Sequence, residues 1–346
     1  MPASSAAQPS TVHVAVAVIC HQARYLLGFR AAHQHQGNRY EFVGGKIEAN
    51  ETPIRALCRE VHEETGIVID NSPKRKLGRL QHDYGDKRVC LHVYEVRLDA
   101  VQYAEHQHQA QGLEGQTLTW VDKEALIAGR YPLPAANATI LAWLELPSVI
   151  TISYPLSAFA TARDPMQAWL AHHERLAPKT AVYLRLQTDV AAATTAIDTL
   201  LHLRPDIYAI VPHTVHAATR EITHLNQRTL LAWQAAPDSV DIDSERPLLL
   251  SCHDEASIDA ANQLAQQRLN NGLSPVVGLL LSPVCATQTH PDASPLGWAA
   301  WSALAARADV PVIALGGLHP DMAEQAADYG AYGVAGIREF QPALII

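Results

Sequence analysis

Hydrophobic and polar residues in the first 150 positions follow patterns typical of short strands. Two apolar runs, residues 12–20 and 25–30, are separated by a polar break, which predicts a β-hairpin. Further strands are expected in three apolar segments: 76–85, 87–98 and 118–122. Residues 133–146 read as a closing helix. We therefore expect a mixed sheet with helices on both sides.

Residues 53–65 are predicted to form a helix with clear end signals. Thr52 suits the N-cap, Pro53 suits the first helical position, and Gly66 can end the helix. Four apolar residues at helical spacing form one stripe expected to be buried: Ile54, Leu57, Cys58 and Val61.

Three glutamates of this helix, Glu60, Glu63 and Glu64, gather on a second face, roughly 120° from the apolar stripe. Neighbouring like charges destabilise a helix, so a bound cation is one natural compensation. Carboxylate oxygens suit Mg²⁺, and Mn²⁺ is an alternative. For three glutamates alone, a solvated acidic face is the preferred interpretation.

The second half of the chain alternates short apolar runs with helical segments. The expected strands are residues 149–156, 180–187, 206–211, 228–233, 247–252, 276–283, 311–317 and 332–337. The expected helices are residues 190–203, 256–270, 298–308 and 320–329. This alternation predicts a parallel (β/α)8 barrel of the TIM type, whose ligands bind at the carboxyl ends of the strands. Gly316 and Gly317, at one such end, could bring backbone N–H groups close to a phosphate.

Composition and charge narrow the class of protein. A chain of 346 residues accommodates two domains, and we place them at 11–146 and 151–346, after a disordered tail at 1–10. The net charge of -9 argues against binding a nucleic-acid polymer. No apolar run is long enough to span a membrane, and no signal peptide is evident. The five scattered cysteines indicate neither a disulfide framework nor a zinc site, so we expect a cytoplasmic protein.

Residues 45–67 carry the motif Gly-x5-Glu-x7-Arg-Glu-apolar-x-Glu-Glu-x-Gly-apolar at every specified position: Gly45, Glu51, Arg59, Glu60, Val61, Glu63, Glu64, Gly66 and Ile67. This segment resembles the Nudix box. The resemblance implies an α/β/α sandwich that hydrolyses nucleoside diphosphates linked to another moiety. It also implies Mg²⁺ bound by the helix carboxylates and by the carbonyl of Gly44.

Within this superfamily, residues 12–146 resemble the MutT type, which hydrolyses oxidised guanine nucleotides. The resemblance assigns Arg30 and Phe42 to the nucleotide site, Glu114 to the metal site and Asn137 to base recognition, while Val43 replaces the family's usual proline. An asparagine amide can accept a hydrogen bond from N7–H of 8-oxoguanine, a donor that guanine lacks. The alternative is that Asn137 only caps the following helix.

The implied reaction converts 8-oxo-dGTP to 8-oxo-dGMP and pyrophosphate. Glu60 is the first choice for the general base, and Arg59 is expected to pair with Glu51 and hold the helix against the preceding loop. The two H-x-H pairs, at 33/35 and 106/108, lie in glutamine-rich loops and are expected to be solvated, although His35 could approach the phosphates.

Residues 247–337 resemble thiamine phosphate synthase and the related TenI proteins. In the TenI branch the histidine of an S-x-H segment serves a thiazole tautomerase, and His253 stands at that position. A partly buried histidine bonded to a carbonyl is an equal alternative. Arg185 is retained, but Gln187 replaces the synthase lysine. Pro212, His213 and Thr229 stand where the synthases carry acidic metal ligands. We therefore expect a degenerate barrel that binds a thiamine-related phosphate or forms a dimer surface.

The first hypothesis is thus a MutT-type hydrolase acting on a small nucleotide, fused to this barrel. The second is a bifunctional thiamine enzyme. In that case the Nudix domain would hydrolyse damaged thiamine diphosphates or precursors, and the barrel would bind or tautomerise thiazole phosphate.

Overall fold

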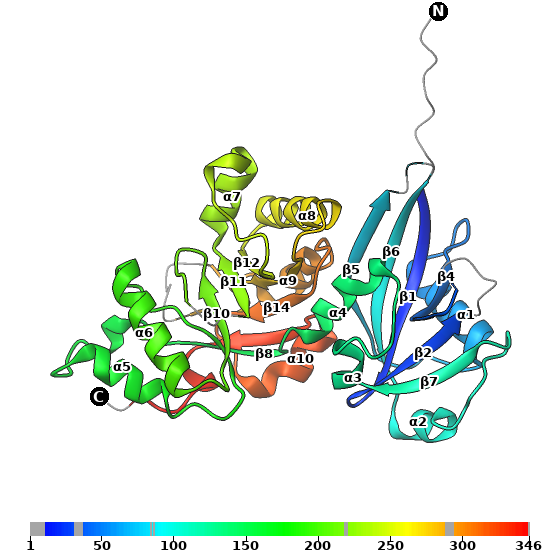
Figure 1. The fold of residues 1–346 in the computed structure, drawn as a ribbon, viewed down its shortest axis with the longest axis horizontal. Coiled ribbons are helices and arrows are strands. Elements are labelled where there is room, and N and C mark those ends of the chain that lie inside the picture. Colours follow the sequence, from blue (N-terminus) through cyan, green and yellow to red (C-terminus); the bar gives the residue numbers. More distant parts are fainter. Residues whose placement is uncertain are drawn as a thin grey trace, which may run out of the picture. The chain divides into compact units, whose positions relative to one another are not determined.

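A computed structural model describes residues 11–30, 37–83, 85, 87–217, 221–287 and 294–344. The chain divides into two compact units, Met1–Glu145 and Leu146–Ile346, which are described separately below (Figure 1).

The N-terminal unit is built on a seven-stranded mixed sheet. Its strands are β1 (Thr11–His21), β2 (Arg24–Arg30), β3 (Arg39–Glu41), β4 (Val43–Lys46), β5 (Lys74–Asp83), β6 (Arg88–Arg97) and β7 (Thr117–Asp122). The order is β3-β2-β1-β6-β5, with β4 paired to β1 and β7 to β2. β1 and β6 are parallel, and the other pairs are antiparallel. The predicted mixed sheet and opening hairpin are confirmed.

Helices lie on both sides of this sheet. They are α1 (Pro53–Thr65), α2 (Ala100–His106), α3 (Lys123–Ile127) and α4 (Ala138–Glu145). Figure 1 shows α1 on one side of the sheet and α3 and α4 on the other. Because strand residues alternate between faces, Ala15, Ala17 and Ile19 of β1 enter the core that includes α1.

Helix α1 spans the thirteen residues predicted. The Thr52 hydroxyl accepts a hydrogen bond from the backbone N–H of Arg55, and Gly66 ends the helix in the left-handed conformation at φ 77°. The predicted apolar stripe was wrong at one end. Ile54 is 36% exposed, because the first turn lies over an open surface groove instead of the sheet, and Ala56 is buried in the core with Leu57 and Val61.

The C-terminal unit is a closed barrel of parallel strands, which confirms the predicted (β/α)8 architecture. Around the barrel the order is β10-β11-β12-β13-β14-β15-β8-β9. The strands are β8 (Val149–Ile152), β9 (Ala181–Tyr183), β10 (Tyr208–Pro212), β11 (Ile222–Leu225), β12 (Leu248–Cys252), β13 (Val276–Leu281), β14 (Val312–Leu315) and β15 (Gly333–Gly336). The helices are α5 (Pro165–His173), α6 (Val190–Leu203), α7 (Gln227–Ala235), α8 (Glu255–Asn270), α9 (Gly297–Ala305) and α10 (Ala323–Asp328).

One predicted barrel strand was wrong. Residues 228–233 lie within helix α7, and the strand at this place in the barrel is the shorter β11 just before it. The side chain of Asn226 starts the helix by accepting a hydrogen bond from the backbone N–H of Thr229, at 2.9 Å. Leu230 and Trp233, three residues apart, are then buried on one helical face.

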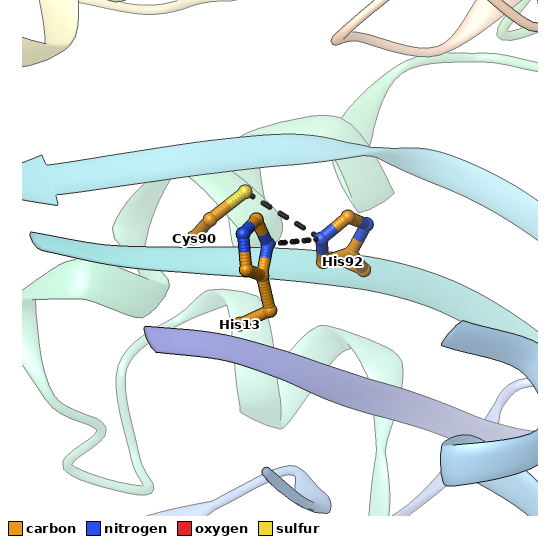
Figure 2. A group of neighbouring side chains, drawn as sticks. All are labelled: His13, Cys90 and His92. Carbon is orange, nitrogen blue, oxygen red and sulfur yellow. Dashed lines mark hydrogen bonds between the residues drawn. The ribbon is translucent and has the colours of Figure 1, made fainter. Parts of the chain in front are cut away.

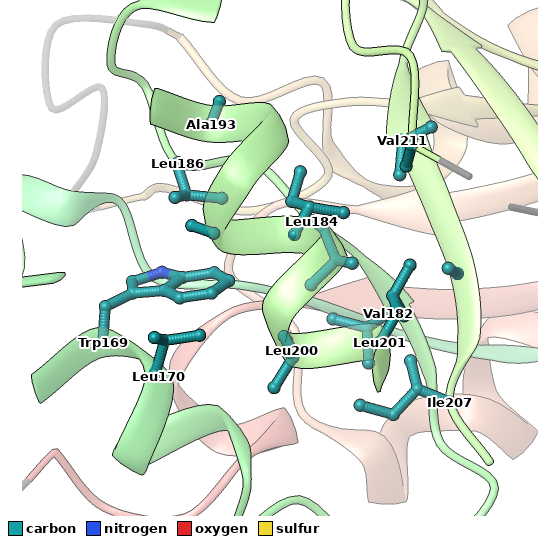
Figure 3. Packing of buried hydrophobic residues seen from close by; sticks show 14 of the residues in the cluster. Trp169, Leu170, Val182, Leu184, Leu186, Ala193, Leu200, Leu201, Ile207 and Val211 are labelled. Carbon is teal, nitrogen blue, oxygen red and sulfur yellow. The ribbon is translucent and has the colours of Figure 1, made fainter. Parts of the chain in front are cut away.

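Aliphatic and aromatic side chains fill the layer between the barrel strands and helices α5 and α6. Figure 3 shows Trp169 and Leu170 of α5 facing Leu200 of α6, beside Val182 of β9. This continuous core holds the carboxyl ends of neighbouring strands in place. In the part of the chain that the structure describes, no helix has both the length and the apolar character needed to cross a membrane.

Candidate functional site

Four carboxyl groups lie near one another beside strand β4. Glu60 and Glu64 come from α1, Glu41 from the end of β3, and Glu114 from the loop before β7. Burial, followed by the charges of Glu41, Glu60 and Glu114, raises the pKa of Glu64 to about 8. A hydrogen bond with the backbone of Gly44 opposes this shift only in part. Glu64 is thus the most perturbed acid of this group.

The two glycines of β4 make room for two different neighbours, Gly45 for helix α1 and Gly44 for strand β1. A Cβ built on Gly45 would lie 2.2 Å from Cδ of Glu60, so any larger residue would displace that carboxyl group. A Cβ built on Gly44, whose φ is 153°, would lie 2.1 Å from the carbonyl oxygen of Ala15. Gly45 therefore allows the Glu60 carboxyl group to lie directly against the backbone of β4.

Arg59 connects Glu51, in the loop before α1, to the glutamates of α1. Its Nε and Nη2 donate to the two carboxylate oxygens of Glu51, at 3.1 and 2.9 Å. Its Nη1 donates to Glu60 at 2.8 Å and to Glu63 at 3.0 Å, and Nη2 also donates to the carbonyl oxygen of Lys46 at 3.0 Å. This bidentate pairing lowers the pKa of Glu51. The expected pair of Arg59 with Glu51 is present, and it extends to Glu60.

The loop that carries Glu114 is attached to the end of α1. The backbone N–H of Leu113 and the side-chain amide of Gln116 both donate to the carbonyl oxygen of Glu64, at 2.8 and 3.0 Å. Glu114 itself is exposed, and its charge acts on Glu64. These hydrogen bonds hold the loop of Glu114 beside Glu64, although the two glutamates are about fifty positions apart in the chain.

This set of side chains fits a hard divalent cation. Neighbouring carboxylates repel one another unless a proton or a cation compensates their charge, and this repulsion adds to burial in raising the pKa of Glu64. All four side chains are oxygen donors, which Mg²⁺ and Mn²⁺ prefer. Glu63, with 51% of its side chain exposed, points to Arg59 and lies at the edge of this group.

Glu41 is a member of this cluster that the sequence did not reveal. It precedes the box, and its partner Arg30 lies in the neighbouring strand β2. The Arg30 Nε donates to Oε2 of Glu41, while burial raises the pKa of Glu41 despite this pairing. The opposite charges of Arg30 and Glu41 were the available signal, but residues 39–41 were not predicted to form a strand.

The expected base-binding residues lie in the same unit. Phe42 is buried at 5% exposure and Asn137 at 8%. Asn137 ends a 3-10 turn, Ala135–Asn137, that runs into α4, so it does not stand at the helix N-cap. Its low exposure sets it in the interior of the unit, near the start of α4. His35 lies outside the described residues.

An open groove of about 750 Å³ runs along the other side of α1. It is lined in part by Cys58, His62 and Lys74, and it includes Glu51 and Arg59 at its margin. Neither Glu64 nor Asn137 lines it, so we do not assign the nucleotide to this groove.

In the C-terminal unit, the expected site residues all follow the carboxyl ends of barrel strands. Arg185 follows β9, and His253 follows β12. Next to them, Nε2 of His224 lies 2.8 Å from Oγ of Ser251, and burial, followed by the charges of Arg185 and His213, lowers the pKa of His224 to about 3. This neutral, buried histidine was not singled out from the sequence.

His253 follows the end of β12 at Cys252 and is exposed, not partly buried as in the alternative interpretation, but the bond to a carbonyl in that interpretation is present. Its Nδ1 lies 2.8 Å from the carbonyl oxygen of Ser282, so Nδ1 carries the hydrogen and donates it. Nε2 is then the basic nitrogen of the ring.

Gly316 and Gly317 follow β14, with φ of 106° and 67°. A Cβ on Gly316 would lie 2.8 Å from Cα of Pro283, and one on Gly317 would lie 2.6 Å from the carbonyl oxygen of Ala286. Close packing of the chain after β13 therefore explains both glycines without a phosphate.

Two family models match the sequence. The NUDIX domain matches residues 14–143, and thiamine monophosphate synthase matches residues 224–340. The chain is 40% identical to an 8-oxo-dGTP diphosphatase of Haemophilus influenzae over 101 residues, which are 29% of this chain and 66% of that protein. It is 33% identical to the 8-oxo-dGTP diphosphatase of Escherichia coli over 116 residues, 34% of this chain and 81% of that protein. It is also 30% identical to the CTP pyrophosphohydrolase of E. coli over 130 residues, 38% of this chain and 88% of that protein.

Proposed function

Because this chain belongs, through its N-terminal unit, to the Nudix hydrolases of the MutT type, we propose that this unit hydrolyses 8-oxo-dGTP to 8-oxo-dGMP and pyrophosphate. The observation that carries the proposal is the convergence of four carboxyl groups beside Gly44 and Gly45. A nucleoside triphosphate brings several negative charges to this point, so a divalent cation is required between it and the glutamates.

We assign the cation to Glu60, Glu64 and Glu114, with the carbonyl of Gly44 and with Glu63 at the margin. Mg²⁺ is the proposed ion and Mn²⁺ the alternative; when bound, it neutralises phosphate charge and lowers the pKa of a bound water. Glu60 is the proposed base. Arg59 orients it, since the guanidinium binds Glu51 and Glu60 at once.

Recognition of the oxidised base is assigned to Asn137, with Phe42 lining the pocket and Arg30 and His35 toward the phosphates. The Asn137 amide can accept from N7–H of 8-oxoguanine and donate to O6. Guanine would place a lone pair against the same amide oxygen, and an unpaired buried polar group is costly. The burial of Asn137, at 8% exposure, supports the assignment, because a buried amide needs a polar partner.

The test is a comparison of Glu60→Gln with Glu64→Gln in the full-length protein. Glu60→Gln is expected to keep the fold and to lose most hydrolysis of 8-oxo-dGTP even at a saturating cation concentration, because glutamine cannot accept the proton. Glu64→Gln is expected to weaken cation binding. Full turnover by Glu60→Gln would exclude Glu60 as the base. The raised pKa of Glu64 makes it the alternative base, in which case Glu64→Gln would bind the cation normally and lose turnover.

The substrate is tested with a panel of 8-oxo-dGTP, dGTP, CTP, ADP-ribose and oxidised thiamine diphosphate. The proposal requires the highest kcat/KM on 8-oxo-dGTP. A preference for CTP would align this chain with its CTP-hydrolysing relative instead. A preference for the thiamine compound would favour the bifunctional thiamine enzyme.

For the barrel we propose binding of a thiamine-related phosphate without thiamine phosphate synthesis. Pro212 and His213 stand at the end of β10, and Thr229 lies in the first turn of α7. These residues replace the acidic metal ligands that the synthases carry at the corresponding positions. Exposed His253 and partly buried Arg185 are the proposed contacts. Calorimetric titration with thiazole phosphate tests this, with His253→Ala as the matched variant. Absence of heat at millimolar ligand would remove the proposal.

A further inference from the structure

A second group of metal-binding side chains lies on the sheet of the N-terminal unit. His13 comes from β1, and Cys90 and His92 come from β6. The two strands are parallel, and their register places His13 beside Cys90. Because strand side chains alternate, Cys90 and His92 face the same side. Figure 2 shows the three side chains pointing toward one another.

The distances among these side chains suit a small metal ion. Nδ1 of His13 lies 3.0 Å from Nε2 of His92, and Sγ of Cys90 lies 3.6 Å from the same nitrogen. All three ligand atoms lie within 4.8 Å of one another. In a tetrahedral zinc site, bond lengths of about 2.0–2.1 Å to nitrogen and about 2.3 Å to sulfur separate two nitrogens by about 3.4 Å and nitrogen from sulfur by about 3.6 Å. Only a small separation of the two imidazoles would be needed.

We propose that His13, Cys90 and His92 bind a transition-metal ion, with Zn²⁺ the favoured ion, at a site separate from the glutamate cluster. Two imidazoles and a thiolate select borderline or soft metals, whereas Mg²⁺ prefers oxygen ligands.

The setting of the cluster agrees with a three-ligand site that keeps one open position. Cys90 is buried, His92 is half-buried and His13 is exposed, so an ion can enter from the solvent beside His13. Arg79 and Lys76 lie close enough for their charges to act on His92, and a thiolate at Cys90 would offset part of that positive charge.

This site differs from the glutamate cluster in both position and chemistry. Gly44 pairs with Val16, which lies three residues beyond His13 on β1, or roughly 10 Å along the strand.

The alternative to metal binding is that the three side chains only hydrogen-bond to one another.

Cobalt substitution of the full-length protein separates the two alternatives. Co²⁺ bound to a cysteine thiolate absorbs in the near ultraviolet through charge transfer, whereas Co²⁺ on carboxylates does not. We expect this band to saturate at one equivalent of Co²⁺, and we expect Zn²⁺ to displace it. A folded wild-type protein without the band would overturn the proposal.

Variants of single residues test whether the near-ultraviolet absorption band comes from Co²⁺ bound to His13, Cys90 and His92. Cys90→Ser is expected to abolish it, and the exposed His13→Asn, which leaves the core intact, is expected to lower Co²⁺ affinity by at least about 10-fold. The matched control is Cys58→Ser, which changes a half-buried cysteine of α1 outside the cluster and should retain the band. Glu64→Gln should also retain it. Loss of the band in either control, or its persistence in Cys90→Ser, would contradict the assignment.

Discussion

The carboxyl group of Glu60 lies against Gly45 so closely that a Cβ atom at Gly45 would fall 2.2 Å from both Cδ and Oε2 of Glu60. The glycine that opens the box motif and the glutamate fifteen residues later therefore depend on each other sterically. The absence of a side chain at Gly45 sets the position of the proposed catalytic carboxylate.

Gly45→Ala is accordingly expected to displace Glu60 and to lower kcat by about 100-fold, because a shift of about 1 Å in a catalytic group has effects of that size. The matched control is Gly28→Ala in β2, where a Cβ would meet its nearest atom at 4.0 Å. Steady-state kinetics of both variants make the measurement. If Gly45→Ala kept normal kcat, the position of Glu60 would not limit turnover.

Arg59→Lys is expected to lower kcat by about 10- to 100-fold while the protein stays folded. A lysine is a single charged donor and cannot hold both oxygens of Glu51 while also binding Glu60. Arg55→Lys, an exposed change on the same helix, is the control and should leave kcat unchanged. Equal activity of the two variants would show that the bidentate geometry is not needed.

Asn137→Ala is expected to reduce the preference for 8-oxo-dGTP over dGTP by about 100-fold or more, measured as the ratio of the two kcat/KM values. The loss should fall on 8-oxo-dGTP, since guanine cannot use the same hydrogen bond. Asn71→Ala, an exposed change in the same unit, serves as the control. An unchanged ratio would leave base recognition to other residues.

Cation binding is expected to depend on pH through Glu64. Its pKa is raised to about 8, first by burial and then by the neighbouring glutamates, so at pH 7 the metal-free protein holds a proton there. A cation requires the carboxylate, so binding must release that proton, and affinity should rise about tenfold per pH unit until about pH 8.

Calorimetry in buffers with different ionisation enthalpies measures the released proton. Glu64→Gln should remove both the proton release and the pH dependence. Glu63→Gln, which changes the more exposed glutamate of the same helix, should keep them. A cation affinity that stayed flat from pH 6 to pH 8 in the wild type would contradict this account.

Features that depend only on residues close together in the chain were predictable from the sequence. Helix α1 begins and ends where expected, because Thr52 and Gly66 act on the backbone within a few residues of themselves. The strand expected at residues 228–233 shows the limit of this reasoning. An apolar run of that length suits either a strand or a helix, and the cap at Asn226 decided for the helix.

The sequence alone determined the mixed-sheet and barrel architectures, the box helix and the chemical identity of its acidic face, because these follow from spacing along the chain. Only the tertiary structure brought Glu41 to Glu64 and His13 to Cys90, since those pairs meet through strand pairing and helix packing. The physical reason is that a contact between distant residues depends on register and packing, which no local pattern contains.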